Sequence, residues 1–172
     1  MTETTSALPE AFLTFLRTAL FYGVGIGSSL LDLRERFGPE AESRVFPELD
    51  GSPPTPQREA SYWKRWAELP AEFTFTGDLL WAISLDTYQG ANAALLGPGE
   101  DVSPAGVAAY LARHGLTYRV RSPSEQQPLL EYLLPNGVAL EFDEAPDEGI
   151  PLSLLSVEHV HSLLPFTLIS SL

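Results

Sequence analysis

Apolar residues near the start of the chain recur every three or four positions, which is the spacing of an amphipathic helix. The stripe consists of Phe12, Phe15, Leu16, Ala19 and Leu20. Ser6 is placed to cap this helix and Pro9 to occupy its first turn. Ser29 and Asp32 then have the spacing of a capping box with Asp in place of Glu, which predicts a short second helix ending at Gly38-Pro39.

A proline-rich stretch follows the second predicted helix. Residues 40–57 contain four prolines and show little periodicity, which is typical of a long surface loop. Beyond the loop, aromatic residues return to helical spacing over 58–69, so a short helix ended by Pro70 is predicted there. Those aromatic residues are Tyr62, Trp63 and Trp66.

Alternation of apolar and polar residues predicts strands in several places. Residues 72–76 and 79–85 alternate on either side of Gly77-Asp78, which punctuates them. In the second run, one strand face would carry Leu79, Trp81, Ile83 and Leu85. Residues 152–160 and 166–169 are further strand candidates.

A capped helix and a hairpin are predicted in the second half of the chain. Ser103 fits the N-cap position, Gly115 fits the position after the helix end, and Leu116 would complete a Schellman motif. Residues 116–121 then alternate as a half-exposed strand. Two more alternating runs flank Pro135-Asn136-Gly137, and an Asn-Gly turn between such runs indicates a β-hairpin.

These elements predict an α+β fold with a mainly antiparallel sheet and short helices packed on one face. The reason is that hairpins, rather than long crossovers, connect the strands. Residues 1–172 have the length of a single domain. Each half reads as helices followed by strands, so two similar α-then-β units, 1–96 and 97–172, are a further hypothesis.

Composition narrows the classes of partner. The chain carries a formal net charge of −13, which weighs against nucleic acid and anionic membranes as partners. It has no cysteine, so thiolate chemistry, disulfides and thiolate metal sites are excluded. The longest charge-free apolar stretch near the N-terminus runs from Thr18 to Leu31, shorter than a membrane-spanning helix requires, and a cytoplasmic location is expected.

Two motifs suggest chemistry only weakly. The glycine run Gly23–Ser28 has serine at position 28, where a dinucleotide fingerprint needs its third glycine, and it lacks the lysine of a phosphate loop, so a flexible connector is the expected interpretation. His159 and His161 would share a strand face, but no third metal ligand is identifiable, and two ordinary histidines are the expected interpretation. No catalytic residue, metal site or cofactor is predicted.

The negative charge is concentrated near the C-terminus. Residues 122–172 hold eight acidic side chains and no Lys or Arg. Clustered carboxylates favour a docking surface for a basic protein, although solubility alone would also account for them. The candidate partner-binding residues are Glu141, Asp143, Glu144, Asp147 and Glu148, with Trp63 and Trp66 as aromatic anchors if they are exposed.

Several turns and caps carry a family resemblance. They are Gly25–Leu33, Phe37-Gly38-Pro39, Phe75–Leu79, the Val102-Ser103 helix start, Leu116-Thr117-Tyr118 and Asn136–Asp143. Together they resemble small bacterial proteins encoded near toxin systems and suspected of being immunity proteins. That group has no family-wide catalytic residues, so the resemblance implies a binding protein and no site chemistry.

The sequence therefore favours a non-enzymatic bacterial binding protein, an immunity-type inhibitor that docks an acidic surface on a basic toxin domain. A small enzyme or ligand-binding domain with a pocket between helices and sheet is the alternative from another class. A homo-oligomeric structural subunit that uses an uncovered sheet edge is a third hypothesis.

Overall fold

The fold is that of a computed structural model and is described for residues 4–45, 61–66, 69–86, 95–122, 129–145 and 150–160. The chain gathers into two compact units. Unit 1 combines residues 1–25 with 84–158, and unit 2 combines 26–83 with 159–172. Both units are built from discontinuous segments, and the division at residue 96 stays a prediction.

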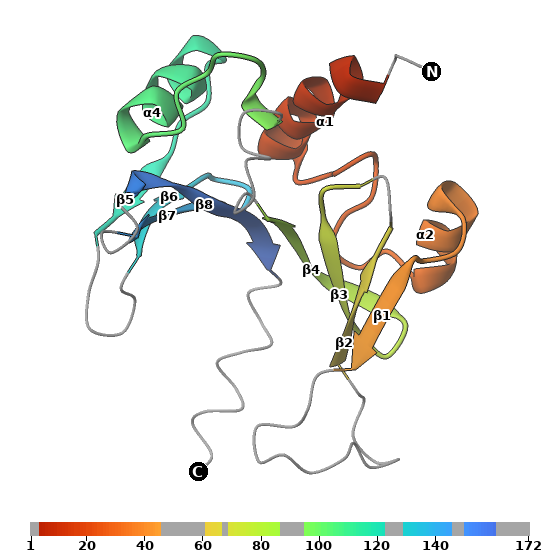
Figure 1. The fold of residues 1–172 in the computed structure, drawn as a ribbon. Helices are drawn as coiled ribbons and strands as arrows, with labels where there is room; N and C mark the ends of the chain where they lie inside the picture. Colours follow the sequence, from red (N-terminus) through yellow and green to blue (C-terminus); the bar gives the residue numbers. More distant parts are fainter. Residues whose placement is uncertain are drawn as a thin grey trace, which may run out of the picture. The chain divides into compact units, whose positions relative to one another are not determined.

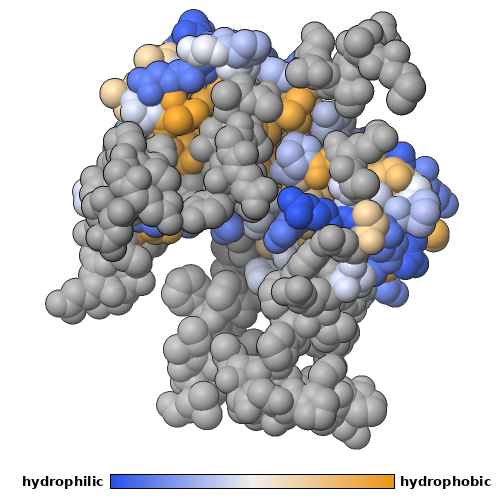
Figure 2. All heavy atoms as spheres, in the orientation of Figure 1, coloured by the Kyte–Doolittle hydropathy of each residue, from blue (hydrophilic) through white to orange (hydrophobic). Residues whose placement is uncertain are grey.

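Unit 1 packs two helices against strands. Its helices are α1 (Thr4–Thr18) and α4 (Pro104–Arg113), and its strands are β5 (Arg119–Arg121), β6 (Leu130–Leu133), β7 (Val138–Ala145), β8 (Ile150–Val160) and the end of β4 (Leu79–Asp86). Both helices lie on the same side of these strands (Figure 1). Figure 2 shows apolar side chains, in orange, grouped near α4, with hydrophilic residues covering the outer side of that helix.

The core of unit 1 confirms most of the predicted apolar stripe. Its fully buried side chains include Phe12, Phe15, Leu16, Val107, Leu111, Leu140 and Phe142. Leu20 is the exception in the stripe, with 41% of its surface exposed. The helix ends at Thr18, and Ala19 takes a positive φ of 58°, so Leu20 no longer follows the helical face.

Unit 2 contains one described helix and the other strands. They are α2 (Leu30–Phe37), β1 (Glu42–Val45), β2 (Ser61–Arg65), β3 (Glu72–Thr76) and the start of β4. Its core holds an aromatic cluster in which the ring centroids of Trp66 and Phe73 are 5.4 Å apart. The Trp66 indole Nε1 donates a hydrogen bond of 2.8 Å to the carbonyl oxygen of Gly38, just after α2. The polar end of this buried ring is therefore satisfied.

The described strands are hydrogen-bonded in the order β1-β2-β3-β4-β8-β7-β6-β5. The registered pairs β1–β2, β2–β3, β5–β6 and β6–β7 are antiparallel. The predicted α+β class with a mainly antiparallel sheet is confirmed. None of the helices in the described ranges combines the length and apolar character needed to span a bilayer.

The local turn and cap signals are also confirmed. The Ser29 hydroxyl accepts from the Asp32 backbone N–H, and the Asp32 carboxylate accepts from the Ser29 backbone N–H, as a capping box requires. At the end of α4 the Leu116 N–H donates to the Leu111 carbonyl at 2.9 Å, as in a Schellman motif, with Gly115 at φ 68°. The Asn-Gly hairpin joins β6 to β7, and β8 includes the strand predicted over 152–160.

The helix predicted over 58–69 is wrong, because Ser61–Arg65 forms strand β2. β2 pairs on one side with β1 and on the other with β3, so its backbone groups are satisfied by neighbouring strands and not by a helix. Tyr and Trp favour strands, so tertiary pairing and strand propensity together outweigh a short helical spacing. β1 likewise occupies the first part of the predicted surface loop 40–57, whose remainder lies outside the described residues.

One smaller expectation also fails. α1 begins at Thr4, two residues before Ser6, so Ser6 is a helical residue and not the N-cap. In β4, Leu79, Trp81, Ile83 and Leu85 share one strand face as predicted. Ile83 and Leu85 are buried, whereas Leu79 is 58% exposed and Leu80 on the opposite face is buried. Both faces of this strand are covered along part of its length, so buried and exposed residues do not simply alternate along it. The candidate strand 166–169 lies outside the described residues.

The glycine-rich segment is a connector between α1 and α2, as predicted, and it is paired through its backbone. Phe21 and Val24 exchange two backbone hydrogen bonds across Tyr22 and Gly23, both of which have positive φ. The following residues pair with the start of β4, since the Gly27 N–H donates to the Leu80 carbonyl at 2.8 Å. These pairings use amides that a phosphate loop would have left available for an anion.

Candidate functional site

The register of unit 1 places charged residues on one face of three neighbouring strands. Arg121 on β5 is paired with Glu131 on β6, and Glu131 is paired with Glu141 on β7. Neighbours in register point to the same side of a sheet. Residues of the opposite parity, Tyr132, Leu140 and Phe142, are buried in the core of the unit. The pleat therefore sends the charged set to the side away from that core.

A fourth element adds a further carboxylate to this cluster. Ser84 on β4 donates its hydroxyl to Oε1 of Glu158 on β8 at 3.1 Å. Burial, chiefly, together with the negative charges of Glu141 and Glu131, raises the pKa of Glu158, and the Ser84 hydrogen bond partly opposes that rise. Glu158 is therefore within electrostatic reach of both carboxylates. We call Glu131, Glu141, Asp143 and Glu158 the carboxylate face.

Members of the carboxylate face differ in exposure. Glu131 is only 5% exposed, Glu141 and Glu158 are half-buried, and Asp143 is exposed. A buried carboxylate is unfavourable unless a cation or hydrogen bonds compensate it. Nη1 of Arg121 lies 3.0 Å from Oε2 of Glu131 and provides such a cation. This ion pair joins the carboxylate face to β5.

Arg121 modifies the expectation of an unbroken negative surface. The chain segment 122–172 contains no basic residue, yet pairing of β5 with β6 brings Arg119 and Arg121 to the rim of the same face. A count of charge by segment misses this because strand neighbours come from different segments. The rim facing β5 is positive, and the negative charge is concentrated over β7 and β8.

The predicted site residues have different outcomes. Glu141 and Asp143 lie on one face of β7, as the alternation predicts. Asp147 and Glu148 lie outside the described residues, as do the side chains of Glu144 and Trp63. Trp66 is 3% exposed and belongs to the core of unit 2, so it does not meet the condition of exposure for an anchor.

Three residues of the site were not among those predicted from the sequence, namely Glu131, Glu158 and Ser84. Glu131 could have been identified from the predicted hairpin, because counting outward from Asn136 along both strands puts Glu131 opposite Glu141. The sequence holds no comparable signal for Ser84 and Glu158, which are 74 residues apart and meet only through the order of β4 and β8.

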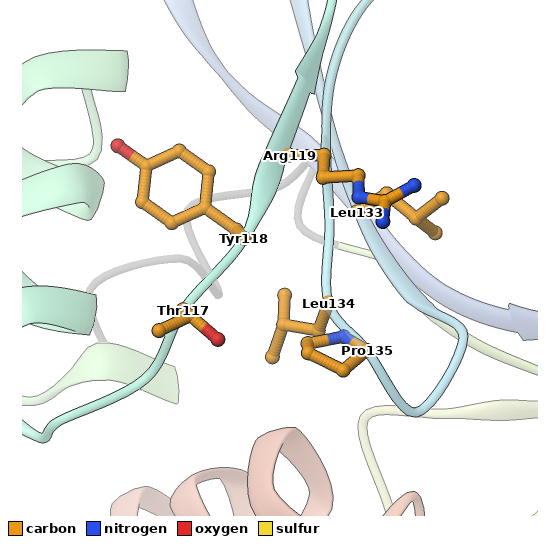
Figure 3. Close-up of a pocket in the computed structure, with 6 residues that line it drawn as sticks. All are labelled: Thr117, Tyr118, Arg119, Leu133, Leu134 and Pro135. Carbon is orange, nitrogen blue, oxygen red and sulfur yellow. The ribbon is translucent and has the colours of Figure 1, made fainter.

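A pocket of about 540 Å³ opens beside the end of the β5–β6 ladder. It is lined by Thr117, Tyr118, Arg119, Leu133, Leu134 and Pro135. Figure 3 shows Tyr118 and Thr117 on one side of the strands with Leu134 and Pro135, while Arg119 and Leu133 point to the other side. The Tyr118 ring stacks on Tyr132 with centroids 4.4 Å apart, which fixes one wall of the pocket.

Within the described part of the chain, no group of three or more His, Asp and Glu side chains is arranged to hold a metal ion. His159 lies on β8, and His161, its expected partner, lies outside the described residues. Comparison of the chain with protein families, curated proteins and solved structures found no match.

Proposed function

We propose that this chain is a non-enzymatic binding protein whose carboxylate face docks on a basic surface of another protein. The observation that carries the proposal is the crowding of Glu131, Glu141 and Glu158. Two of them are directly paired across strands, and the third has its pKa raised partly by the other two. Carboxylates directly opposite each other on neighbouring strands repel one another.

A basic partner would relieve this repulsion. A partner Lys or Arg placed over the face would be attracted by its accessible carboxylates. The net charge of −13 would also speed the encounter with a cationic protein. Exposed Asp143 would make early contact, and half-buried Glu141 and Glu158 would be covered later.

The specific form of this proposal is an immunity-type inhibitor that acts in the bacterial cytoplasm and covers the active site of a basic toxin domain, such as a nuclease. Its support is the resemblance in turns and caps noted above, together with the negative surface that blocking a nucleic-acid-binding site would require. Proteins of this type act by occupying a surface, so no catalytic residue, metal or cofactor is part of the proposal.

The test is binding to the purified product of a toxin-like gene neighbouring this one. We expect binding that weakens as salt is raised from about 50 to 300 mM, because exposed charges are screened. Asp143→Lys and Glu141→Lys should each weaken affinity by about tenfold or more, equivalent to about 1.4 kcal/mol. Glu35→Lys, on the exposed surface of α2, is the matched charge-reversal control and should bind within about twofold of the unchanged chain.

Equal loss of binding by all three variants would point to net charge and not to the carboxylate face. Absence of binding to every toxin-like neighbour would contradict the inhibitor role. The pocket beside β5 favours a second candidate, a ligand-binding domain, since it combines an apolar wall with the polar side chain of Thr117. Stabilisation of the chain against heat by a small molecule, lost in Thr117→Trp, would support that candidate instead.

A further inference from the structure

Among the strands that the structure describes, β5 is an edge strand. It stands at the end of the hydrogen-bonded order, with β6 as its neighbour on the inner side. Arg119, Val120 and Arg121 are all exposed, and Val120, an apolar residue, is 58% exposed. An edge strand presents unpaired backbone N–H and C=O groups along its outer side, where another extended segment can pair. All three residues of the strand are exposed, as an accessible edge requires.

A pocket lies next to this edge, between the chain segments that extend β5 and β6. The last pair of the ladder is Arg119 with Leu133, and past it the two chain segments separate around the cavity lined by Tyr118, Leu134 and Pro135. Leu134 is buried, and Tyr118 is held against Tyr132, so the walls are set by the core of unit 1. An extended chain lying along β5 would pass this pocket and could insert an apolar side chain there.

The two arginines define the charge that the edge accepts. They are two residues apart on a strand, so both point to the same face. Arg121 is already in an ion pair with Glu131. Arg119 is paired in register with Leu133, an uncharged residue, so the ladder supplies no carboxylate opposite it. A strand added outside β5 would bring its own side chains opposite these arginines, and carboxylates would be favoured there.

We propose that β5 binds an extended acidic segment of another protein, which adds to the sheet as an extra antiparallel strand. A carboxylate of that segment pairs with Arg119, and a neighbouring apolar side chain enters the pocket beside Tyr118. This site lies on the sheet edge and takes an acidic partner, whereas the carboxylate face is proposed to take a basic one. The proposal is therefore independent of the docking function of the carboxylate face.

A second copy of this chain fits the edge less well. If two copies of β5 paired antiparallel about Val120, Arg119 of one would lie opposite Arg121 of the other, and like charges directly across strands are destabilising. Charged residues on an edge commonly prevent such self-pairing. The same pair of arginines therefore disfavours self-association and favours an acidic strand.

The test uses fluorescein-labelled, end-capped heptapeptides and fluorescence anisotropy with the full chain. One peptide alternates valine with glutamate, and the matched peptide carries lysine at the glutamate positions. We expect the glutamate peptide to bind and the lysine peptide to bind at least about tenfold more weakly. Arg119→Glu should reverse this preference, whereas Arg17→Glu, an exposed arginine on α1, should leave it unchanged. Circular dichroism confirms that each variant is folded.

Amide shifts in NMR spectra locate the site, and we expect the largest changes at Arg119, Val120 and Arg121 when the glutamate peptide is added. No binding of that peptide at about 1 mM, or equal affinity for the unchanged chain and Arg119→Glu, would overturn the proposal. So would light scattering that shows a dimer strengthened by Arg119→Glu, since that change replaces the Arg119–Arg121 repulsion between two paired copies of β5 by an attraction and the edge would then be occupied by a second copy.

Discussion

The stability of the fold depends on pH through the carboxyl group of Glu158. Burial and its two neighbouring carboxylates raise its pKa, so ionisation destabilises the folded state relative to the unfolded state. That penalty is present at neutral pH and disappears as the pH falls below the usual value for glutamate. We expect Glu158→Gln to raise the free energy of unfolding at pH 7 and to match the unchanged chain near pH 4, measured by urea unfolding. Asp143→Asn, an exposed control on the same face, should change stability much less.

Glu40 shows the opposite behaviour in unit 2. It receives two hydrogen bonds from Arg34 and lies 2.5 Å from Nζ of Lys64, whose side chain is 8% exposed. The Arg34 hydrogen bonds, and then Lys64, hold the pKa of Glu40 far below its usual range. The stabilisation that follows is present at neutral pH and is lost as the pH falls through the acid range below 4.5.

We therefore expect Glu40→Gln to destabilise the chain at pH 7 by about 3 kcal/mol, because it removes the charge of Glu40 from beside the buried Lys64 ammonium. The loss should shrink as the pH is lowered. The double variant Glu40→Gln with Lys64→Met should recover much of it in urea unfolding, since it removes the buried charge as well. A double variant no more stable than the single one would contradict this explanation.

Asn136 connects distant parts of unit 1. Its Nδ2 donates to the Leu16 carbonyl at 3.0 Å, and its Oδ1 accepts from the Val138 N–H at 3.2 Å. Asn136→Ala should lose about 1–2 kcal/mol of stability, because both partners lose a hydrogen bond. Asn136→Asp retains the acceptor for Val138 but cannot donate to Leu16, so the difference between the variants in thermal unfolding isolates the long-range contact.

At the scale of elements, helix α4 depends on two glycines for different reasons. Gly115 has a φ of 68°, and no atom lies within 4 Å of the point where a Cβ would stand, so Gly115→Ala introduces backbone strain alone, about 1 kcal/mol. Gly115→Asn should cost less, since Asn tolerates this conformation. Gly106 is instead crowded, because a Cβ there would lie 2.4 Å from Cβ of Asp101.

Gly106→Ala should therefore destabilise the chain more than Gly115→Ala does, and Gly106→Asn should give no rescue. Asp101 also accepts hydrogen bonds from the Ser103 N–H and hydroxyl, so the clash reaches the start of the helix. Amide hydrogen exchange in the first turn of α4 would separate the two cases, because only Gly106→Ala should accelerate it.

Elements whose signals are local were predictable, and those that depend on distant pairing were not. Ser29 with Asp32, Ser103 with Gly115, and the Asn136-Gly137 turn each specify a structure within a few residues. β2 has no such signal, since its strand conformation comes from pairing with β1 and β3. The same reason explains the candidate site, where Glu141 and Asp143 followed from one strand but Ser84 and Glu158 needed the strand order.

At the scale of the whole molecule, the net charge of −13 opposes compaction. Salt should therefore stabilise the folded chain. We expect the midpoint of thermal unfolding at pH 7 to rise between about 10 and 300 mM NaCl, as the Debye length falls below the spacing of exposed carboxylates. The stability lost on Glu40→Gln should respond differently to salt, because the Glu40–Lys64 pair is largely buried and salt screens buried charges poorly. A midpoint independent of salt would contradict the view that self-repulsion matters.

The hydrogen bond from Asn136 to the Leu16 carbonyl also sets an order of events during synthesis. Its two residues are 120 positions apart in the chain. When α1 leaves the ribosome, the hairpin that binds its C-terminal end has yet to be translated. The apolar stripe of α1 therefore lacks this packing partner through most of translation. At about 5–20 residues per second, that interval lasts roughly 6 to 24 seconds. The nascent chain therefore exposes Phe12, Phe15 and Leu16 to chaperones for far longer than a helical hairpin would.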